Sequence, residues 1–261
     1  MNTKKYAVVT GGSSGIGFEI ACRLAKRKYH LILVARIKKK LQRSAEVIGH
    51  KYGVNVHCFC LDLRDTSGLE KLKEDLEIFG ENVEILVNNA GIGLGGEFGS
   101  EDLKTDLKLI DLNIRALVSM THFYISKFKQ KRAGYILNIA SLAGFQPGPY
   151  YANYYATKSY VLSFTEAIAF EAKKYGVHCS TLCPGTTNTN FHARAGTNST
   201  RLSKGLFSII DSAERVSKIG VKGLFAGRRV IIPGILNNLL AFSVRLIPRS
   251  CVTAITSWIN Q

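Results

Sequence analysis

Residues 150–158, with the sequence YYANYYATK, hold four tyrosines close to a lysine. On a helix, residues three or four positions apart share a face, so Lys158 can assist Tyr154 or Tyr155 but not Tyr150 or Tyr151. A neighbouring ammonium favours the phenolate and lowers the pKa of a tyrosine from about 10 toward the working range. Such a tyrosine can exchange a proton with an alcohol or carbonyl oxygen. The spacing therefore predicts an acid–base tyrosine in this segment.

A second candidate site is a glycine-rich turn near the start of the chain. An apolar run ends at Thr10 and is followed by Gly11, Gly12, Ser13, Ser14, Gly15, Ile16 and Gly17, and then by a helical pattern. Glycines alone suit any tight turn. A strand before the turn and a helix after it, however, let the backbone approach a pyrophosphate, which the helix dipole and free N–H groups favour. This context predicts dinucleotide binding.

The residue after the second apolar run bears on which dinucleotide is used. NAD-binding folds usually carry an acidic residue there for the ribose hydroxyls, whereas this chain has Arg36, followed by Lys38, Lys39 and Lys40. A carboxylate would repel a 2′-phosphate, and a guanidinium can bind two of its oxygens. Arg36 therefore predicts that NADP(H) is preferred over NAD(H); the alternative is a solvated arginine at a strand end.

The elements that must position these residues alternate between two patterns. Short apolar, β-branched runs predict strands at residues 6–10, 30–35, 54–61, 83–89, 134–141 and 177–185. Amphipathic segments predict helices at residues 37–52, 66–79, 103–130 and 153–175. This alternation predicts an α/β fold with a doubly wound parallel sheet, a Rossmann fold, flanked by helices on both faces. No linker interrupts the chain, so a single domain over residues 1–261 is expected.

Composition limits the other functions that the chain could have. The 35 Lys and Arg against 19 Asp and Glu give a net charge of +16, but the basic residues are spread out and no nucleic-acid-binding motif accompanies them. A solvated basic surface is expected, with no nucleic-acid partner. The six cysteines form no CxxC pair and show no zinc spacing, which predicts buried free thiols and no metal site. The N-terminus lacks signal-peptide features, so a cytoplasmic protein is expected.

Five elements resemble the short-chain dehydrogenase/reductase family, in the family's order over residues 4–190. They are Thr10-Gly11 with Gly15-Ile16-Gly17, Asn88-Asn89-Ala90-Gly91, Ser141, Tyr154-x-x-x-Lys158 and Pro184-Gly185. Residues 143–149 and the tyrosines are also similar to a subgroup near the ketoacyl and steroid reductases. The resemblance implies an NADP(H)-dependent oxidoreductase that interconverts a carbonyl and an alcohol by hydride transfer. The alternative is a dinucleotide-binding sensor or scaffold without turnover.

The resemblance also implies roles for single residues. Tyr154 would be the general acid and base, Ser141 would bind the substrate oxygen, Asn113 would hold a water of the proton relay, and Lys158 would bind the nicotinamide ribose. Asp62 would contact adenine. The implied cofactor contacts are Gly11, Ser13, Ser14, Gly15, Ile16, Gly17, Arg36, Asp62, Leu63, Asn89, Ala90, Gly91, Tyr154, Lys158, Pro184, Gly185, Thr187 and Thr189.

Taken singly, three of these residues have simpler explanations. Asn113 could be an ordinary polar residue of a helix, Asp62 a turn former and Ser141 a helix cap. Tyr150 and Tyr151 are expected to line the substrate cleft, and Tyr155 to pack on the other side of its helix.

The last third of the chain is expected to decide substrate and partners. Residues 186–226 resemble the region that covers the substrate in this family, and a lid is expected there. Phe145, Phe191 and the nearby tyrosines favour a rather apolar ligand, such as a ketone, a 3-oxoacyl group or a steroid. Residues 234–261 are an apolar and basic extension, too short and interrupted for a membrane span of about twenty residues. A subunit contact or pocket wall is expected there, with peripheral membrane contact as the alternative. The family resemblance implies a homodimer or homotetramer.

Overall fold

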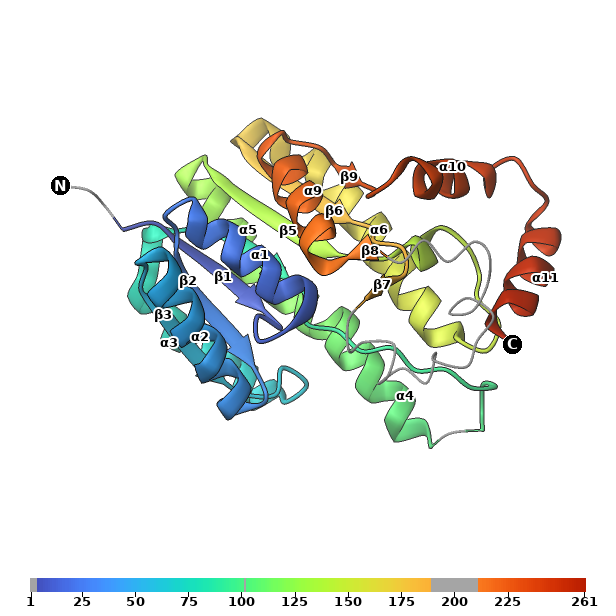
Figure 1. Ribbon diagram of the computed structural model, residues 1–261, viewed down its shortest axis with the longest axis horizontal. Coiled ribbons are helices and arrows are strands. Elements are labelled where there is room, and N and C mark those ends of the chain that lie inside the picture. The colour runs from blue at the N-terminus through green and yellow to red at the C-terminus, as the bar shows by residue number, and fades with distance from the viewer. Residues whose placement is uncertain (1–3, 101, 189–210) are drawn as a thin grey trace.

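Seven parallel strands form the central sheet of the computed structural model, which describes residues 4–100, 102–188 and 211–261 (Figure 1). Their order is β3-β2-β1-β4-β5-β6-β9. The strands are β1 Tyr6–Thr10, β2 His30–Ala35, β3 Val56–Cys60, β4 Val83–Asn88, β5 Gly134–Ile139, β6 Val177–Leu182 and β9 Val230–Ile231. The order reverses where β4 returns to pair with β1. Ligands of such sheets bind at this reversal, outside the carboxyl ends of the strands.

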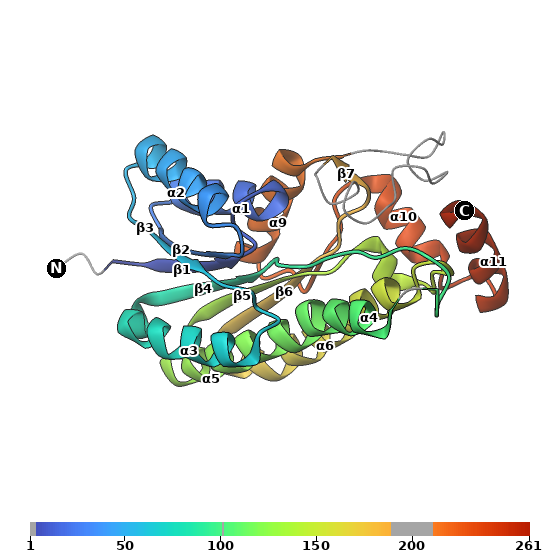
Figure 2. The same cartoon turned by 90° about the horizontal axis from the view of Figure 1, so that it is seen from below.

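Helices cover both faces of the sheet, which confirms the doubly wound α/β fold (Figure 2). The helices α1 Gly15–Lys26, α2 Lys38–Tyr52 and α9 Ala213–Phe225 lie on one face; α3 Thr66–Leu76, α5 Leu117–Lys131 and α6 Ala152–Ala172 lie on the other. Val8 and Ile32 belong to the core under the second group, and Val9 and Leu33 to the core under the first. Because successive strand side chains point to opposite faces, both must be apolar, which explains the continuous apolar runs.

The helical segments differ in detail from the sequence prediction. The segment expected at 66–79 is α3 followed by a 3-10 turn, Glu77–Asn82, in which Gly80 has φ of +46°. The segment expected at 103–130 is α4 Leu103–Ile110, a π-helical turn Asp111–Ala116 and α5. The segment expected at 153–175 is α6 and a 3-10 turn, Lys173–Tyr175. Strand β9 was not predicted because two residues carry no recognisable alternation.

The range expected to be a lid, residues 186–226, contains two short strands that pair with each other and a helix that packs on the rest of the fold. Thr187–Asn188 (β7) pairs with Asp211–Ser212 (β8), and α9 lies against α1. The contact includes a hydrogen bond of 2.8 Å from Arg23 Nε to Ser217 Oγ. Helix α9 is thus part of the layer over the sheet. Residues 189–210, and with them Phe191 and Thr189, lie outside the described residues.

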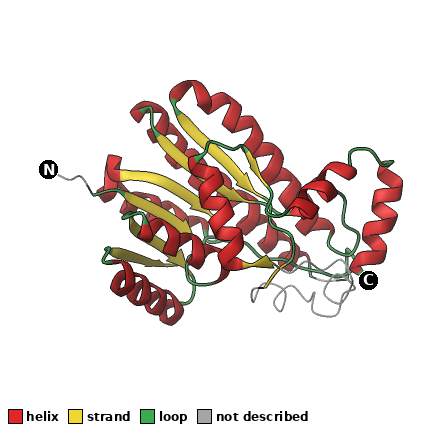
Figure 3. Cartoon of the chain, turned by 45° about the horizontal axis from the view of Figure 1, so that its top comes forward, coloured by secondary structure: helices red, strands yellow, loops and turns green. Residues whose placement is uncertain are grey.

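The C-terminal extension forms two further helices, α10 Ile235–Ser243 and α11 Arg249–Asn260. They lie beyond the carboxyl end of the sheet, at the end of the molecule opposite the N-terminus, instead of on either face (Figures 1 and 3). Across the described ranges, no helix is both long and apolar enough to cross a membrane.

The expectation of buried thiols is wrong for half of the cysteines. Cys22, Cys179 and Cys183 are buried free thiols, whereas Cys58, Cys60 and Cys251 are exposed free thiols. Cys58 and Cys60 belong to β3, which is an edge strand with one neighbour. The apolar character of a strand does not reveal whether a helix covers it completely.

A buried chain of hydrogen-bonded polar side chains lies on one face of the sheet, at the carboxyl ends of β4 and β5. Asn88 and Asn138 are register partners on these strands. Asn88 Nδ2 donates to Asn138 Oδ1 and to Thr121 Oγ1, each at 2.9 Å, and Asn138 Nδ2 donates to Thr165 Oγ1 at 2.9 Å. Thr165 Oγ1 donates to the Val161 carbonyl oxygen at 2.6 Å. The chain therefore links β4, β5, α5 and α6.

We expect Asn138→Ala to lower the free energy of unfolding by about 1–3 kcal/mol, because it leaves buried groups of Asn88 and Thr165 without their partner. Urea unfolding followed by circular dichroism measures the loss. Asn82→Ala, at an exposed position, is the control and should stay within about 0.5 kcal/mol of the unmodified protein. Equal losses in the two variants would contradict this account of the polar chain.

Candidate active site

The glycine-rich turn after β1 is closed tightly onto the end of β4. A Cβ atom at Gly11, where φ is +66°, would lie 2.7 Å from Asn89 Nδ2, and one at Gly17 would lie 2.3 Å from the same atom. Asn89 Nδ2 donates to the carbonyl oxygens of Thr10 and Gly11 at 3.1 and 3.2 Å. Thr10 Oγ1 accepts hydrogen bonds from the backbone N–H groups of Asn89 and Ala90 at 3.0 and 3.1 Å. Only glycine fits at positions 11 and 17.

This turn presents the start of α1 at the carboxyl edge of the sheet. Gly15 has φ of +57°, and Ser14 is the N-cap residue, but its side chain makes no capping hydrogen bond. The Ser13 carbonyl oxygen accepts a hydrogen bond from Ser44 at 3.1 Å, which ties the turn to α2. Ile16 packs against the core below. The first-turn N–H groups of α1 are suited to a negatively charged ligand such as a pyrophosphate.

Charged side chains gather where β2 and β3 end. Asp62 lies 3.6 Å from Arg36 Nη1, measured from Oδ2, and its two oxygens accept hydrogen bonds from Arg64 Nε at 3.0 and 3.1 Å. These bonds from Arg64 lower the pKa of Asp62, against the effect of burial. Arg36 keeps 42% of its side chain exposed. The neighbouring Leu63 is buried. Arg64 therefore neutralises Asp62 and leaves most donors of Arg36 for other partners.

Sequence reasoning missed Arg64. Its only signal in the sequence is its position two residues after Asp62, which lets a side chain return to the carboxylate across one turn.

Ser141, Tyr154 and Lys158 come together at the ends of β5 and α6. Ser141 follows β5, and its Oγ accepts a hydrogen bond from Ala143 N–H at 3.2 Å, so that it also caps the 3-10 turn Leu142–Phe145. It is hydrogen-bonded to Tyr154. Lys158 Nζ lies 5.8 Å from the centroid of the Tyr154 ring. The serine is thus both the cap that simple chemistry suggests and a neighbour of the tyrosine.

Burial dominates the acid–base behaviour of this group. It raises the pKa of Tyr154 to about 12, although the hydrogen bond with Ser141 acts in the opposite direction. It also lowers the pKa of Lys158 from 10.5 to about 8. Lys158 Nζ donates to the Ile139 carbonyl oxygen at 2.9 Å. The net shift of the Tyr154 pKa is therefore upward and not downward as the spacing to Lys158 predicted: burial outweighs the hydrogen bond that favours the phenolate, and the phenol stays protonated at neutral pH.

Asn113 lies in the π-helical turn and holds the loop after β4. Its Oδ1 accepts a hydrogen bond from Ile92 N–H at 3.0 Å, and its Nδ2 donates to the Ile92 carbonyl oxygen at 2.9 Å and to Thr157 Oγ1 at 3.1 Å. A Cβ atom at Gly91 would lie 3.1 Å from Asn113 Oδ1 and 3.6 Å from Lys158 Nζ. Asn113 is therefore a buried neighbour of the candidate site, and turns of this kind are frequent at functional sites.

The remaining tyrosines make contacts of other kinds. Tyr155 is buried and its hydroxyl donates to Asn260 Oδ1 at 3.3 Å, which agrees with a packing role. Tyr151 is buried so closely against Gly95 that a Cβ atom there would lie 2.3 Å from its ring. The Tyr150 hydroxyl accepts a hydrogen bond from Gln261 Nε2 at 2.6 Å. These contacts join the helix start to the loop after β4 and to α11.

The loop after β6 completes the set of predicted residues. The Pro184 carbonyl oxygen accepts hydrogen bonds from Leu142 N–H at 2.9 Å and from Ser141 Oγ at 3.5 Å. Thr187 Oγ1 donates to the Gly185 carbonyl oxygen at 3.0 Å. The loops after all six predicted strands thus supply candidate residues at one edge of the sheet, and Thr189 is the only candidate outside the described residues.

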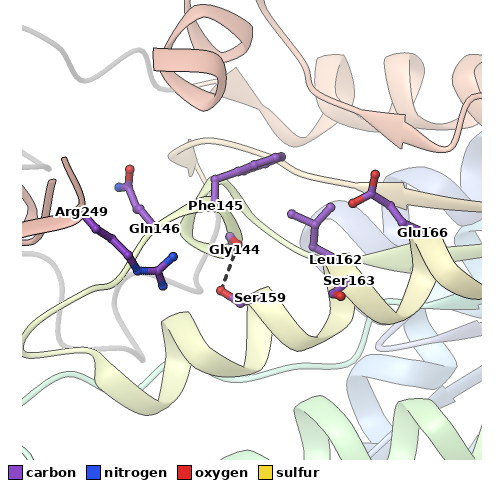
Figure 4. Close-up of a pocket in the computed structure, with 8 residues that line it drawn as sticks. All are labelled: Gly144, Phe145, Gln146, Ser159, Leu162, Ser163, Glu166 and Arg249. Carbon is purple, nitrogen blue, oxygen red and sulfur yellow. Dashed lines mark hydrogen bonds between the residues drawn. The ribbon is translucent and has the colours of Figure 1, made fainter. Parts of the chain in front are cut away.

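A cavity of about 250 Å³ lies between the loop that follows Ser141, helix α6 and Arg249 (Figure 4). It is lined by Gly144, Phe145, Gln146, Ser159, Leu162, Ser163, Glu166 and Arg249. Ser159 Oγ donates to the Gly144 carbonyl oxygen at 2.9 Å and closes the loop onto α6. None of Ser141, Tyr154 and Lys158 lines this cavity, so it is separate from the candidate reaction centre.

Comparisons with known proteins match residues 5–200 to the short chain dehydrogenase family. The very-long-chain 3-oxoacyl-CoA reductase of Laccaria bicolor is 34% identical over 65% of this chain, which spans about half (51%) of that protein. The 7beta-hydroxysteroid dehydrogenase of Clostridium sardiniense is 31% identical over 71% of this chain and 70% of that protein. The structure of a short-chain dehydrogenase from Sphingobium yanoikuyae in complex with NADPH is 28% identical, with a TM-score of 0.82 over 94% of this chain and 97% of that chain.

The lowered pKa of Lys158 predicts how the free energy of unfolding depends on pH. Between its folded pKa of about 8 and its ordinary value of 10.5, the unfolded chain binds a proton that the folded chain does not, so stability from this group rises with pH. Lys158→Met should be more stable than the unmodified protein near neutral pH. This advantage should shrink by about 2 kcal/mol on going to about pH 10.

Urea unfolding of the unmodified protein and of Lys158→Met, near neutral pH and at about pH 10, measures the difference between their free energies of unfolding. Other groups titrate alike in both proteins, so their contribution cancels in this difference. Lys71→Met, at an exposed position, serves as the matched control and should stay close to the unmodified protein at both pH values. A constant advantage of Lys158→Met would show that the ammonium is not destabilised by burial.

Proposed function

The chain belongs to the short-chain dehydrogenase family, and we propose that it is an NADP(H)-dependent oxidoreductase that interconverts a carbonyl and an alcohol. The observation that carries this proposal is the convergence of Ser141, Tyr154 and Lys158, with Lys158 close to Gly91 in the loop that packs on the glycine-rich turn. A dinucleotide-binding sensor or scaffold needs no such group, so the geometry favours the enzyme. The NADPH complex of the Sphingobium yanoikuyae relative supports the cofactor.

The residues present fit such a cofactor. The pyrophosphate would lie against the turn at residues 11–17, in which only glycine fits at positions 11 and 17, and the first-turn N–H groups of α1 would bind it. Gly91 leaves space between Asn113 and Lys158 on the ribose side. When bound, NADPH supplies the hydride that goes to the carbonyl carbon.

In the reductive direction, Tyr154 would donate a proton to the carbonyl oxygen. Its raised pKa keeps the phenol protonated at neutral pH, as a general acid requires. Ser141, hydrogen-bonded to Tyr154, would bind the same oxygen and stabilise the charge that develops there. The Lys158 ammonium would stabilise the phenolate that forms, and its pKa of about 8 keeps it mainly charged at neutral pH. In the oxidative direction the proton would return to Tyr154.

The relatives bear on the class of substrate. The names of the relatives include a 3-oxoacyl-CoA reductase and a hydroxysteroid dehydrogenase, which supports a rather apolar ketone, 3-oxoacyl or steroid-like substrate. A panel of such compounds, assayed by NADPH consumption, identifies the class. The expected homodimer or homotetramer and the cytoplasmic location stay predictions from the sequence.

The acid–base role of Tyr154 makes the sharpest prediction. Tyr154→Phe should lower the turnover number roughly a hundredfold to ten-thousandfold, since the general acid is lost. NADPH should still bind with nearly unchanged affinity in a fluorescence titration. Tyr155→Phe removes the neighbouring hydroxyl, which contacts Asn260, and should retain most of the activity. Similar losses in both variants would assign the proton transfer to another group.

The charges near β2 and β3 support the preference for NADP(H). The Arg64 side chain holds the Asp62 carboxylate with three hydrogen bonds, whereas Arg36 Nη1 lies 3.6 Å from it and 42% of the Arg36 side chain is exposed. A 2′-phosphate would therefore meet the Arg36 guanidinium without an uncompensated carboxylate beside it. Two guanidinium N–H groups can bind two phosphate oxygens.

We expect the KM for NADH to exceed that for NADPH by at least about tenfold, and Arg36→Asp to narrow or invert this ratio, because a carboxylate repels the 2′-phosphate. Initial rates with both cofactors measure the ratio. Arg43→Asp, which makes the same charge change at an exposed position of α2, should leave it unchanged. Equal use of NADH and NADPH by the unmodified protein would contradict the proposal.

A further inference from the structure

Helix α10 has the reverse of the usual distribution of side chains. Its buried residues are Asn237 and Ala241, and the Asn237 amide donates to the Pro233 carbonyl oxygen at 2.7 Å. Apart from Asn238, the exposed residues are large and apolar: Ile235, Leu236, Leu239, Leu240 and Phe242, with exposed fractions of 83%, 36%, 60%, 47% and 58%. A surface helix normally buries its apolar side chains against the core. The outer face of α10 is therefore suited to contact with an apolar partner or environment.

The segment after α10 and helix α11 expose further large apolar side chains. Leu246 and Ile247 connect the two helices and are exposed over 72% and 39% of their area. In α11 the buried residues are Val252, Thr256 and Asn260, four positions apart, while Ile255 and Trp258 are exposed over 51% and 61%. We call the exposed apolar residues of α10, α11 and their connection the C-terminal apolar surface. An exposed apolar patch of several large side chains marks an interaction site.

The charges of this surface indicate what it contacts. Residues 234–261 contain two arginines, Arg245 and Arg249, and no aspartate or glutamate. Both arginines are exposed, and they flank the exposed Leu246 and Ile247. The whole chain carries a net charge of +16. Apolar side chains next to basic ones, with an indole among them, match the boundary between the acyl chains and the headgroups of an anionic bilayer.

We propose that the C-terminal apolar surface docks onto the surface of an anionic lipid bilayer. The helices α10 and α11 have 9 and 12 residues, so they would lie in the plane of the interface instead of crossing the membrane. A second copy of the chain fits this surface less well, because two such surfaces would bring four arginines together without an acidic partner from residues 234–261. The proposal does not depend on the redox activity.

Trp258 is the only tryptophan of the chain, so its fluorescence tests docking in the unmodified protein. Vesicles of phosphatidylcholine mixed with phosphatidylglycerol should shift its emission to shorter wavelength, and brominated acyl chains should quench it. The protein should float with these vesicles at low salt and bind vesicles of phosphatidylcholine alone more weakly. Absence of flotation with the anionic vesicles, or emission that does not respond to them, would overturn the proposal.

Variants distinguish binding through the C-terminal apolar surface from a general electrostatic attraction of the basic protein to anionic lipid. Leu239→Glu/Phe242→Glu should lower the vesicle partition coefficient at least about a hundredfold, since two large apolar side chains are lost from the contact. The control, Ile78→Glu/Phe170→Glu, makes the same two charge changes at positions with exposed fractions of 84% and 77%, outside the C-terminal apolar surface. It should retain binding apart from the small effect of charge.

The same variants distinguish other occupants of the surface. Leu239→Ser/Phe242→Ser removes the apolar groups without adding charge and should also bind weakly. Undiminished binding by both double variants at these positions would assign the contact to another face. If the unmodified protein does not bind vesicles, and Leu239→Glu/Phe242→Glu converts an oligomer to monomers in analytical ultracentrifugation, the surface is a contact between copies and the proposal is wrong.

Discussion

The amides of Asn88 and Asn138 impose the constraint on which the rest of the site depends. Both side chains are buried in the sheet, where they bond to each other, to Thr121 and to Thr165. These hydrogen bonds can form only when β4 and β5 pair in the observed register and α6 turns Thr165 toward Asn138. A slip by one residue would turn these groups to the other face and leave them unpaired in an apolar layer. Asn88 immediately precedes the loop with Asn89, β5 leads to Ser141, and α6 carries Tyr154 and Lys158. The buried chain therefore fixes the mutual position of the three elements that meet at the candidate reaction centre.

The same low polarity acts on the two ionisable groups of that centre in opposite directions. Burial raises the pKa of Tyr154 and lowers that of Lys158, because each group is favoured in its neutral form. As a result, the Tyr154 phenol stays protonated, and the pKa of Lys158 lies close to neutral pH. The Lys158 ammonium donates a hydrogen bond to the Ile139 carbonyl oxygen. Acid and base assignments often follow from pairs of groups whose surroundings shift their pKa values apart. The protonated phenol is the form that the proposed general acid requires.

The sequence predicts those features that depend on local pattern. Six strands follow from apolar runs, the tight turn from Gly11 and Gly17, and the restriction of the four tyrosines to Tyr154 and Tyr155 from their spacing to Lys158. Features that depend on distant partners could not be predicted in this way. They include the pairing of Arg64 with Asp62, the shift of the Tyr154 pKa upward, and the outward direction of the apolar residues in α10. The two-residue strand β9 exists because β6 offers it an edge, which no property of Val230 and Ile231 alone reveals.

The contact between Thr10 and Asn89 has a consequence for how the chain is made. The two residues are separated by 79 positions, and the turn around Gly11 owes its closed shape to their hydrogen bonds. A ribosome adds about 5–20 residues per second, so the first turn exists for roughly 4–16 s before its partner is synthesised. During that time β1 and β2 can pair and Ser44 can donate to the Ser13 carbonyl oxygen, but the hydrogen bonds between Thr10 and Asn89 cannot form. The nucleotide-binding half of the protein thus acquires its ligand-binding geometry only after β4 has emerged, and dinucleotide in the cell can select the folded state no earlier than that.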